Sequence, residues 1–300
     1  MKKLLLLALF SICLAVSVQA QTGKIDPSAL ALANPSSLNS LGMRYLTGKD
    51  VTKDYAQALV YFRAAAEKGH PDAQSNMGYC YENGLGVTKD YAEAAKWYRK
   101  AAEQGEKTSQ KCLGELYYRG NGVAKNYAEA VKWFRKSAEQ GYAPAQTNLA
   151  VCYQDGTGVT KDNTEAVNWF RKAAEKGYAN AQAMLGDCYF MGNGVTQDYT
   201  EAVKWFRKAA EQGNATAQTG LGGSYYLGKG VTQDYAEAAK WLKKAAEQED
   251  VNGIIMLGMC YYYGHGVPKN TEEGIRLTRI AAKKGSELAK QQLKTYNVSE

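Results

Sequence analysis

Small and apolar residues recur along the chain at helical spacing, in segments separated by glycine-rich turns. In the segment "DAQSNMGYCYENG" (72–84), Ala73, Met77, Cys80 and Tyr81 fall on one side of a helix. The segment is followed by "GLGVTKD", whose two glycines suit a tight reversal of the chain. The pattern therefore predicts a helix followed by a turn.

A second amphipathic segment follows each turn. Asp90 and Glu93 form a capping box, in which Asp90 accepts hydrogen bonds from the first N–H groups of the helix and Glu93 reaches back to the cap. Gly105 supplies a left-handed C-cap. The side that we expect to be buried carries Ala94, Trp97, Tyr98, Ala101 and Ala102, and the opposite side is charged.

This pair of segments repeats every 36 residues without insertion. Three registers mark the period. A glycine ends the second helix at Gly69, Gly105, Gly141, Gly177, Gly213 and Gly285; a tryptophan recurs at Trp97, Trp133, Trp169, Trp205 and Trp241; a further glycine stands at Gly42, Gly78, Gly114, Gly186, Gly222 and Gly258. Such a period is typical of a solenoid or a propeller, and the lack of period-two alternation excludes the propeller. Because one such hairpin cannot bury its apolar side alone, neighbouring hairpins must stack.

The sequence predicts four parts of the chain: a signal peptide (1–20), a linker (21–35), seven helix-turn-helix repeats (36–286), and a C-terminal capping helix and tail (287–300). The last part, "ELAKQQLKTY" and its tail, is expected to cover the apolar side of the final repeat.

The first twenty residues have the features of a cleaved secretory signal. Lys2 and Lys3 precede the apolar run "LLLLALFSICLAV", and "VQA" stands before Gln21. The apolar run is too short to span a bilayer, and no transmembrane segment is expected elsewhere. We therefore expect an exported chain that starts at Gln21, in the periplasm or secreted. Lipidation at Cys13 is not expected, because Ile12 stands where a small residue is needed.

Composition narrows the chemistry. The net charge of +7 is spread evenly along the chain, which argues against nucleic-acid binding. With only 2 His and no paired nucleophile and base, we expect no catalytic residue, no metal site and no cofactor. Four cysteines, Cys80, Cys152, Cys188 and Cys260, share one helix position and are interpreted as buried small side chains. A disulfide between Cys80 and Cys112 stays open.

The repeated unit A-x-x-x-[LM]-G-x-x-Y-x-x-G-x-G-V-x-x-D-x-x-x-A-x-x-[WY]-x-x-x-A-A-x-x-G resembles the Sel-one-like repeat, a relative of the tetratricopeptide repeat. The resemblance implies an all-α, right-handed superhelical solenoid whose first helices line a concave groove. It also implies a non-enzymatic scaffold or adaptor that binds a partner protein or peptide. An alternative is an envelope enzyme or a β-lactam- or peptidoglycan-binding protein, like the cysteine-rich members of the family. Those members link the two helices of each unit by a disulfide, whereas the second helices here contain no cysteine.

If the first helices line a groove, four positions of each helix lie on its surface. Counted from the glycine at the position of Gly78, they are the third residue before it and the first, fourth and fifth residues after it. The predicted groove is charged at one end, at Lys111, Glu115 and Arg119. It is largely apolar at the other, at Asp187, Phe190, Met191, Tyr226, Leu227, Met259, Tyr262 and Tyr263. The third position before the glycine adds Thr147, Ala183 and Ile255 to the predicted groove surface. We expect a monomer that binds a protein or peptide through these aromatic anchors. The alternative is that the tyrosines and methionines near the C-terminus pack against the terminal helix.

Overall fold

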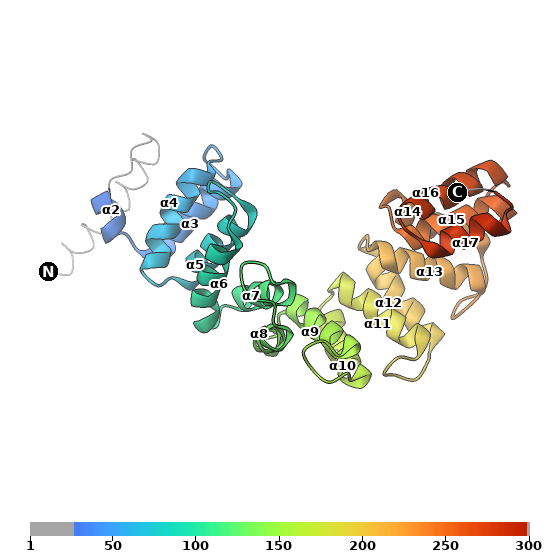
Figure 1. Cartoon of the computed structure of the whole chain (residues 1–300), viewed down its shortest axis with the longest axis horizontal. Helices are drawn as coiled ribbons and strands as arrows, with labels where there is room; N and C mark the ends of the chain where they lie inside the picture. Colours follow the sequence, from blue (N-terminus) through green and yellow to red (C-terminus); the bar gives the residue numbers. More distant parts are fainter. Residues whose placement is uncertain (1–26, 299–300) are drawn as a thin grey trace. The chain divides into compact units, whose positions relative to one another are not determined.

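The computed structural model of the chain describes residues 27–298, which form α-helices joined by short turns (Figure 1). Seven of the described helices are the first helices of the repeats, here called A-helices: α3 (Pro35–Thr47), α5 (Pro71–Asn83), α7 (Lys107–Arg119), α9 (Ala143–Asp155), α11 (Ala179–Met191), α13 (Ala215–Leu227) and α15 (Val251–Tyr263). Seven are the second helices, here called B-helices: α4 (Tyr55–Glu67), α6 (Tyr91–Glu103), α8 (Tyr127–Glu139), α10 (Asn163–Glu175), α12 (Tyr199–Glu211), α14 (Tyr235–Glu247) and α16 (Thr271–Lys283). A short helix, α2 (Pro27–Leu32), precedes the repeats, and α17 (Glu287–Thr295) follows them. The predicted all-α solenoid of helix-turn-helix repeats with a C-terminal helix is confirmed, and the predicted signal peptide lies outside the described residues.

The helices belong to two compact units. The N-terminal unit ends at Tyr142 and holds α2–α8, and the C-terminal unit begins at Ala143 and holds α9–α17. Within each unit, every A-helix packs against its own B-helix, and that B-helix packs against the next A-helix. Each repeat thus obtains from its neighbour the apolar contacts that it cannot make alone.

The segment predicted as a linker holds α2 in its second half. Lys68 Nζ donates hydrogen bonds to the carbonyl oxygens of Leu30, Ala31 and Ala33, at 2.9, 2.8 and 2.6 Å. A lysine in this place satisfies carbonyl groups that the end of a helix leaves unpaired. The residues from Pro27 onward are therefore docked on the first repeat.

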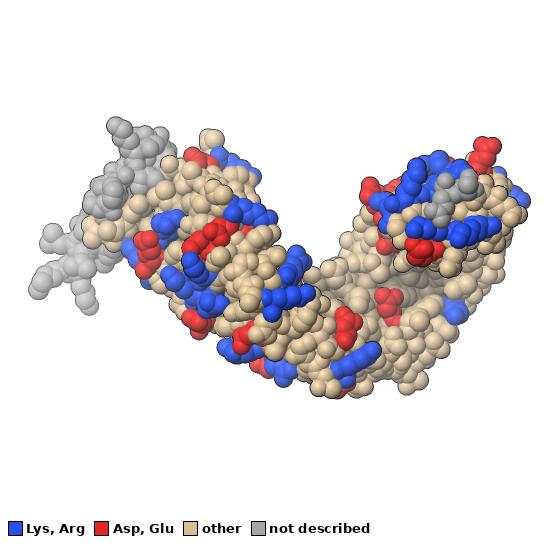
Figure 2. Space-filling view, viewed as in Figure 1, with Lys and Arg blue, Asp and Glu red and all other residues tan. Residues whose placement is uncertain are grey.

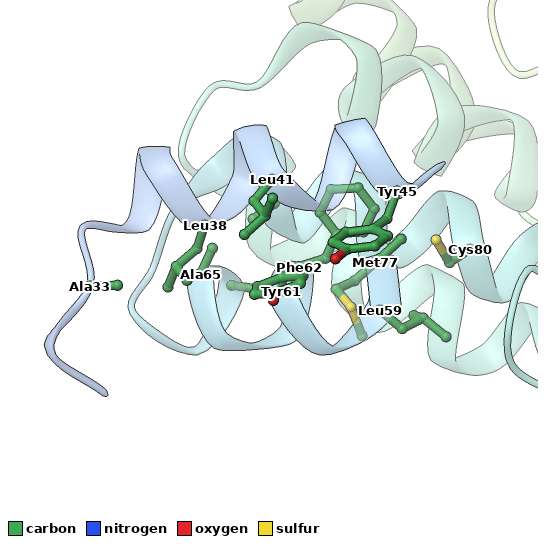
Figure 3. Packing of buried hydrophobic residues seen from close by; sticks show 13 residues of the cluster. Ala33, Leu38, Leu41, Tyr45, Leu59, Tyr61, Phe62, Ala65, Met77 and Cys80 are labelled. Atoms are coloured by element: carbon green, nitrogen blue, oxygen red, sulfur yellow. The ribbon is translucent and has the colours of Figure 1, made fainter. Parts of the chain in front are cut away.

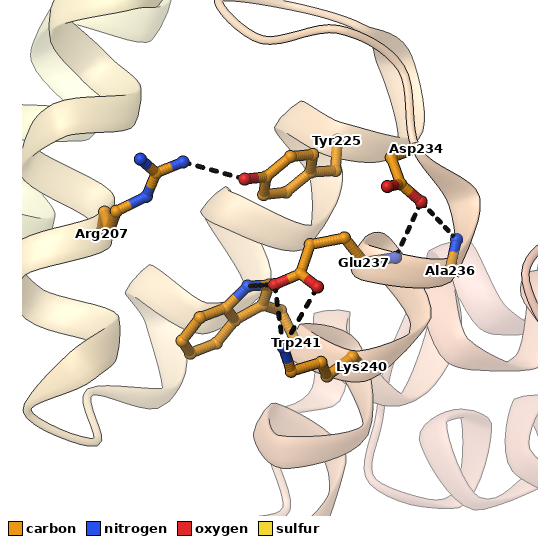
Figure 4. Close-up of polar contacts among 7 residues, drawn as sticks. All are labelled: Arg207, Tyr225, Asp234, Ala236, Glu237, Lys240 and Trp241. Carbon is orange, nitrogen blue, oxygen red and sulfur yellow. Dashed lines mark hydrogen bonds and ion pairs between the residues drawn. The ribbon is translucent and has the colours of Figure 1, made fainter.

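Each B-helix begins at a side-chain cap, as the sequence predicts. Asp90 Oδ1 accepts hydrogen bonds from the N–H groups of Ala92 and Glu93, at 2.8 and 3.0 Å. The second half of the predicted capping box is wrong, because the N–H of Asp90 donates to the carbonyl oxygen of Tyr81, at 2.9 Å. Glu93 forms an ion pair with Lys96 instead. Figure 4 shows the same arrangement at the start of α14.

A glycine in six of the seven A-helices lies directly against a side chain of its own B-helix. A Cβ atom at Gly78 would lie 2.6 Å from the ring of Tyr98, and one at Gly114 would lie 2.6 Å from the ring of Phe134. Both rings are buried. The sequence shows a glycine at this position in the repeats, interrupted only by Ala150. The structure explains the glycine, because the facing side chain leaves no room for another side chain there.

The two glycines of a turn, for example Gly84 and Gly86, have different structural roles. Gly84 and Gly86 both have φ of 69°, in the left-handed region that favours glycine. Gly84 ends α5, and its N–H donates to the carbonyl oxygen of Cys80. Gly86 lies against the backbone of Tyr55 in the preceding repeat, where a Cβ atom would lie 2.6 Å from the carbonyl group. The turn is therefore a contact between repeats as well as a reversal.

The core of the N-terminal unit starts between α3 and α4 (Figure 3). Tyr45 of α3 stacks on Tyr61 of α4, with ring centroids 5.6 Å apart and an interplanar angle of 11°. Phe62, Met77 and Cys80 are fully buried in the same cluster. The cysteine register is therefore part of the core, as predicted.

The tryptophans are less buried than the sequence indicates. Trp133 and Trp169 are buried, but Trp97, Trp205 and Trp241 are only partly so. A lysine one turn later lies over each ring, for example Lys172 Nζ at 4.0 Å from the centroid of Trp169. The fully packed side chain of each B-helix is instead the residue after the tryptophan: Tyr98, Phe134, Phe170, Phe206 or Leu242.

At four places along the chain a buried glutamine links a B-helix to the next repeat, in an arrangement that we call the glutamine relay. Gln74 Nε2 donates to the carbonyl oxygen of Ala66 at 3.1 Å, and Gln74 Oε1 accepts from Gln104 Nε2 at 2.7 Å. Both polar atoms of a side chain that is only 5% exposed are thereby satisfied. The same two bonds recur at Gln110 and Gln140, at Gln182 and Gln212, and at Gln218 and Gln248.

A second polar link joins four of the B-helices to the A-helix that follows. Arg207 Nη2 donates to the hydroxyl of Tyr225 at 2.8 Å (Figure 4). Equivalent bonds join Arg63 to Tyr81, Arg99 to Tyr117 and Arg171 to Tyr189. These bonds fix the rotation of one repeat against the next.

Candidate functional surface

Three large apolar side chains are exposed at one register position of the C-terminal unit. Met191, Leu227 and Tyr263 are the last residues of α11, α13 and α15, and their exposed fractions are 64%, 53% and 48%. Since α11 contacts α13 and α13 contacts α15, the three lie on neighbouring helices. We call them the apolar row. Single exposed apolar residues are common, but a row of them on adjacent helices is typical of an interface.

The residue before each member of the apolar row is half-buried and makes contacts inside the unit. The ring of Phe190 lies edge-on to Tyr199, with centroids 4.9 Å apart. Tyr226 contacts Tyr235 in the same way at 5.1 Å. Tyr262 stacks on Tyr296, just after α17. These three predicted anchors thus pack inside the unit, next to the exposed residues of the apolar row.

In two cases a side chain from the turn of the following repeat packs against the ring that contacts the predicted anchor. Lys229 Nζ lies 4.8 Å from the ring centroid of Tyr199. His265 stacks on Tyr235 at 4.4 Å, and its Nδ1 lies 2.8 Å from the hydroxyl of Tyr226. Sequence reasoning treated these residues as parts of turns and missed the contacts. The available signal was that Lys229 and His265 are 36 residues apart, as are Tyr199 and Tyr235.

Asp187 lies one turn before Met191 and is half-buried, and its carboxylate has no hydrogen bond or ion pair among the described residues. Burial raises the pKa of this carboxyl to about 6. The same register position is Gly223 on α13 and the half-buried Met259 on α15. A Cβ atom at Gly223 would meet only Met256, at 3.4 Å from its methyl carbon.

The predicted charged end of the groove lies in the N-terminal unit, on α7. Lys111 Nζ and Glu115 Oε2 form an ion pair at 2.8 Å, and both side chains are about a quarter exposed. Burial alone would lower the pKa of Lys111, but the hydrogen bond to Glu115 raises it above its usual value. Arg119 ends α7 and is exposed. That these three residues bind a partner stays a prediction.

At one of the four predicted surface positions, the third residue before the glycine, the prediction is wrong for three repeats, whereas Lys111 at the same position is about a quarter exposed. Thr147, Ala183 and Ile255 are 8%, 2% and 2% exposed, respectively, and are packed inside their unit. The third residue before the glycine lies almost one helical turn from it, so the two share the buried side of the A-helix. The residue that follows each is more exposed: Asn148, Met184 or Met256.

The five cysteines of the described chain are all free. Cys112 is partly buried and the other four are buried. Burial raises the pKa of the Cys80 and Cys112 thiols to about 12, and that of Cys152, Cys188 and Cys260 to about 11. The Cys80–Cys112 disulfide that the sequence left open is not formed, and Cys13 lies outside the described residues.

Residues 27–298 hold no group of three His, Cys, Asp or Glu side chains placed to bind a metal ion. Over the same residues, every helix falls short of the length and apolar character that crossing a membrane demands.

Comparisons with known proteins agree with the repeat architecture. The Sel1 repeat model matches seven segments of the chain: 35–70, 71–106, 113–142, 143–178, 179–214, 215–250 and 251–286. A solved protective antigen of uropathogenic Escherichia coli strains, which displays an SLR fold, is 36% identical with a TM-score of 0.76. That match covers 94% of this chain and 58% of the other, so the chain spans less than two thirds of the E. coli protein.

A solved Sel1 repeat protein from Oxalobacter formigenes is 35% identical with a TM-score of 0.75, and the match covers 83% of this chain and 98% of the other. A comparison with curated proteins gave no match. The seven matched segments span most of residues 35–286 and coincide with the helical hairpins. The chain therefore belongs to the Sel1 repeat family.

Proposed function

We propose that this chain is a non-enzymatic scaffold that binds a protein or peptide on its A-helices, with the apolar row as the central contact. Sel1 repeat solenoids typically mediate protein–protein interaction. The observation that carries the proposal is the exposure of Met191, Leu227 and Tyr263 at one register position of three consecutive repeats. Covering the exposed half of Leu227 alone would contribute about 1 kcal/mol to binding.

The geometry beneath the row supports the proposal, because a binding surface needs rigid support. Phe190 lies between Tyr199 of its own repeat and Lys229 of the next. Tyr226 lies in the same way between Tyr235 and His265. Tyr263 itself lies 5.0 Å from Tyr262, centroid to centroid. The exposed side chains therefore stand on fixed positions, which lowers the entropy lost when a partner binds.

The test uses a photo-crosslinking amino acid at position 227 of the full chain, expressed in its own host. We expect a discrete crosslinked partner, whose binding is then measured with purified proteins. Leu288 is a matched control, since it is a leucine of the same unit, is 59% exposed and lies outside the apolar row. Leu227→Ser should weaken binding about tenfold or more, and Leu288→Ser should leave it unchanged. Equal effects of the two substitutions would contradict the proposal, and hydrolysis of a chromogenic β-lactam would contradict its non-enzymatic part.

We also propose that the chain is exported and acts outside the cytoplasm after residues 1–20 are removed. The basic start, the apolar run and the small-residue end of this segment support the proposal. N-terminal sequencing of the protein from its host should begin at Gln21, and an intact Met1 would contradict the proposal.

A further inference from the structure

The A-helices of the C-terminal unit are almost free of charge. In α9, α11, α13 and α15 the charged residues are Asp155 and Asp187, and both are acidic. In the N-terminal unit, α7 carries both signs, at Lys107, Lys111, Glu115 and Arg119. Figure 2 shows the surface over α11, α12 and α13 mostly without charged side chains, whereas charges gather over α14, α16 and α17. In a chain with a net charge of +7, this acidic and apolar surface is a local exception.

Asp187 lies on α11, one turn before Met191 of the apolar row, and its carboxylate has no partner among the described residues. A half-buried carboxylate with neither a hydrogen bond nor an ion pair destabilises the folded chain. Among the neighbouring A-helices, α9 and α13 contain no lysine, arginine or histidine. The adjoining B-helices α10 and α12 do carry cations, but Arg171 and Arg207 donate to the hydroxyls of Tyr189 and Tyr225 instead. A cation from outside would supply the missing partner.

We propose that the partner segment carries a basic side chain that pairs with Asp187, beside large apolar side chains that cover Leu227. This inference rests on the proposed function and names the chemistry of the partner. An acidic segment would meet two aspartates and no cation on α9, α11, α13 and α15, and like charges brought together weaken association. A basic, apolar segment finds complementary charge beside exposed apolar side chains.

The probe is a phage-displayed library of random 12-residue peptides, selected on the immobilised full chain and counter-selected on the Leu227→Ser variant. Synthetic versions of the selected peptides are then measured by fluorescence anisotropy. We expect the selected peptides to contain lysine or arginine together with large apolar residues. A selection that yields acidic peptides, or no peptide sensitive to Leu227→Ser, overturns the inference.

Two variants test the contact itself. Asp187→Asn, which keeps the size of the side chain, should weaken peptide binding about tenfold, and Asp72→Asn, an exposed variant in the N-terminal unit, should leave it unchanged. Replacing the basic residue of the peptide by glutamine should weaken binding similarly, with no further loss on the Asp187→Asn variant.

The failure of this inference and that of the proposed function are distinguishable. If Leu227→Ser abolishes peptide binding and Asp187→Asn does not, the scaffold proposal stands and the basic partner is refuted. If Leu227→Ser has no effect, the apolar row is not a binding surface and both fall.

Discussion

The rings of Tyr262 and Tyr296 lie parallel, with centroids 3.7 Å apart and planes 9° from each other. The stack ties the end of α15 to the residue that ends α17, and Tyr296 is buried. The next residue, Tyr263, is 48% exposed. Two adjacent tyrosines of one helix therefore have different tasks, one in packing and one at the surface.

Tyr262→Ala should lower the free energy of unfolding by about 2 kcal/mol, because it removes a stacked and half-buried ring. Tyr263→Ala should lower it by less than about 1 kcal/mol and act mainly on binding. Urea denaturation of both variants measures the difference. Equal losses of stability would show that Tyr263 also belongs to the packing of α17.

Gly266→Ala should separate the last two repeats. A Cβ atom at Gly266 would overlap the carbonyl oxygen of Tyr235, a backbone atom that cannot move aside alone. Gly285→Ala is a matched control, since Gly285 also has a positive φ and its Cβ atom would meet nothing within 4 Å. We expect the control to cost about 1 kcal/mol and Gly266→Ala about 2–3 kcal/mol more. Faster hydrogen exchange in α16 and α17 of the Gly266 variant alone would locate the effect.

Asp187 should make stability fall as pH rises through the weakly acidic range. Burial raises the pKa of Asp187 from 3.8 to about 6, so between these values the folded chain binds more protons than the unfolded chain. The free energy of unfolding therefore decreases from about pH 4 to about pH 6 and levels off above. Asp187→Asn should remove this decrease and stabilise the chain at pH 7 by up to about 3 kcal/mol.

The measurement is urea denaturation across this pH range for the wild type, Asp187→Asn and the exposed control Asp155→Asn. The control should keep the wild-type slope. An identical slope in all three proteins would show that Asp187 ionises in the folded state at its ordinary pKa.

Thiol titration should report both the absence of disulfides and the removal of the leader. The chain has 6 Cys, of which five lie in the described repeats and Cys13 lies in the predicted signal peptide. Because burial holds the thiol pKa values at about 11 to 12, reaction in the native state should be slow at neutral pH. Under denaturing, non-reducing conditions we expect five thiols in the exported chain and six where the leader is retained. Fewer than five would reveal a disulfide.

Most of the fold could be predicted because the 36-residue register repeats the same local signals. Asp90 as a cap, Gly84 as a turn and Cys80 as a core residue each depend on neighbours within one hairpin, and all three are confirmed. The same register could not predict how repeats contact each other. His265 reaches Tyr226 across 39 residues of sequence, and nothing within one unit indicates that contact.

The candidate surface was predictable only in part, for the same reason. Met191, Leu227 and Tyr263 were among the predicted residues, and they are exposed. Phe190 and Tyr226 had the same apolar character in the sequence, and only the ring contacts of neighbouring segments distinguish them. Periodicity identifies the side of a helix but not the depth of a side chain on that side.

The glutamine relay has a consequence for the history of the gene. The relay places the same donor, acceptor and carbonyl group at junctions in both units, so many junctions between repeats are chemically equivalent. In-frame recombination between two repeats that carry the relay would join a glutamine to its usual partner. Copy number can thus drift between lineages at little cost in folding, while each gain or loss beside Leu227 lengthens or shortens the apolar row. Selection on such a gene would act on the length of that row.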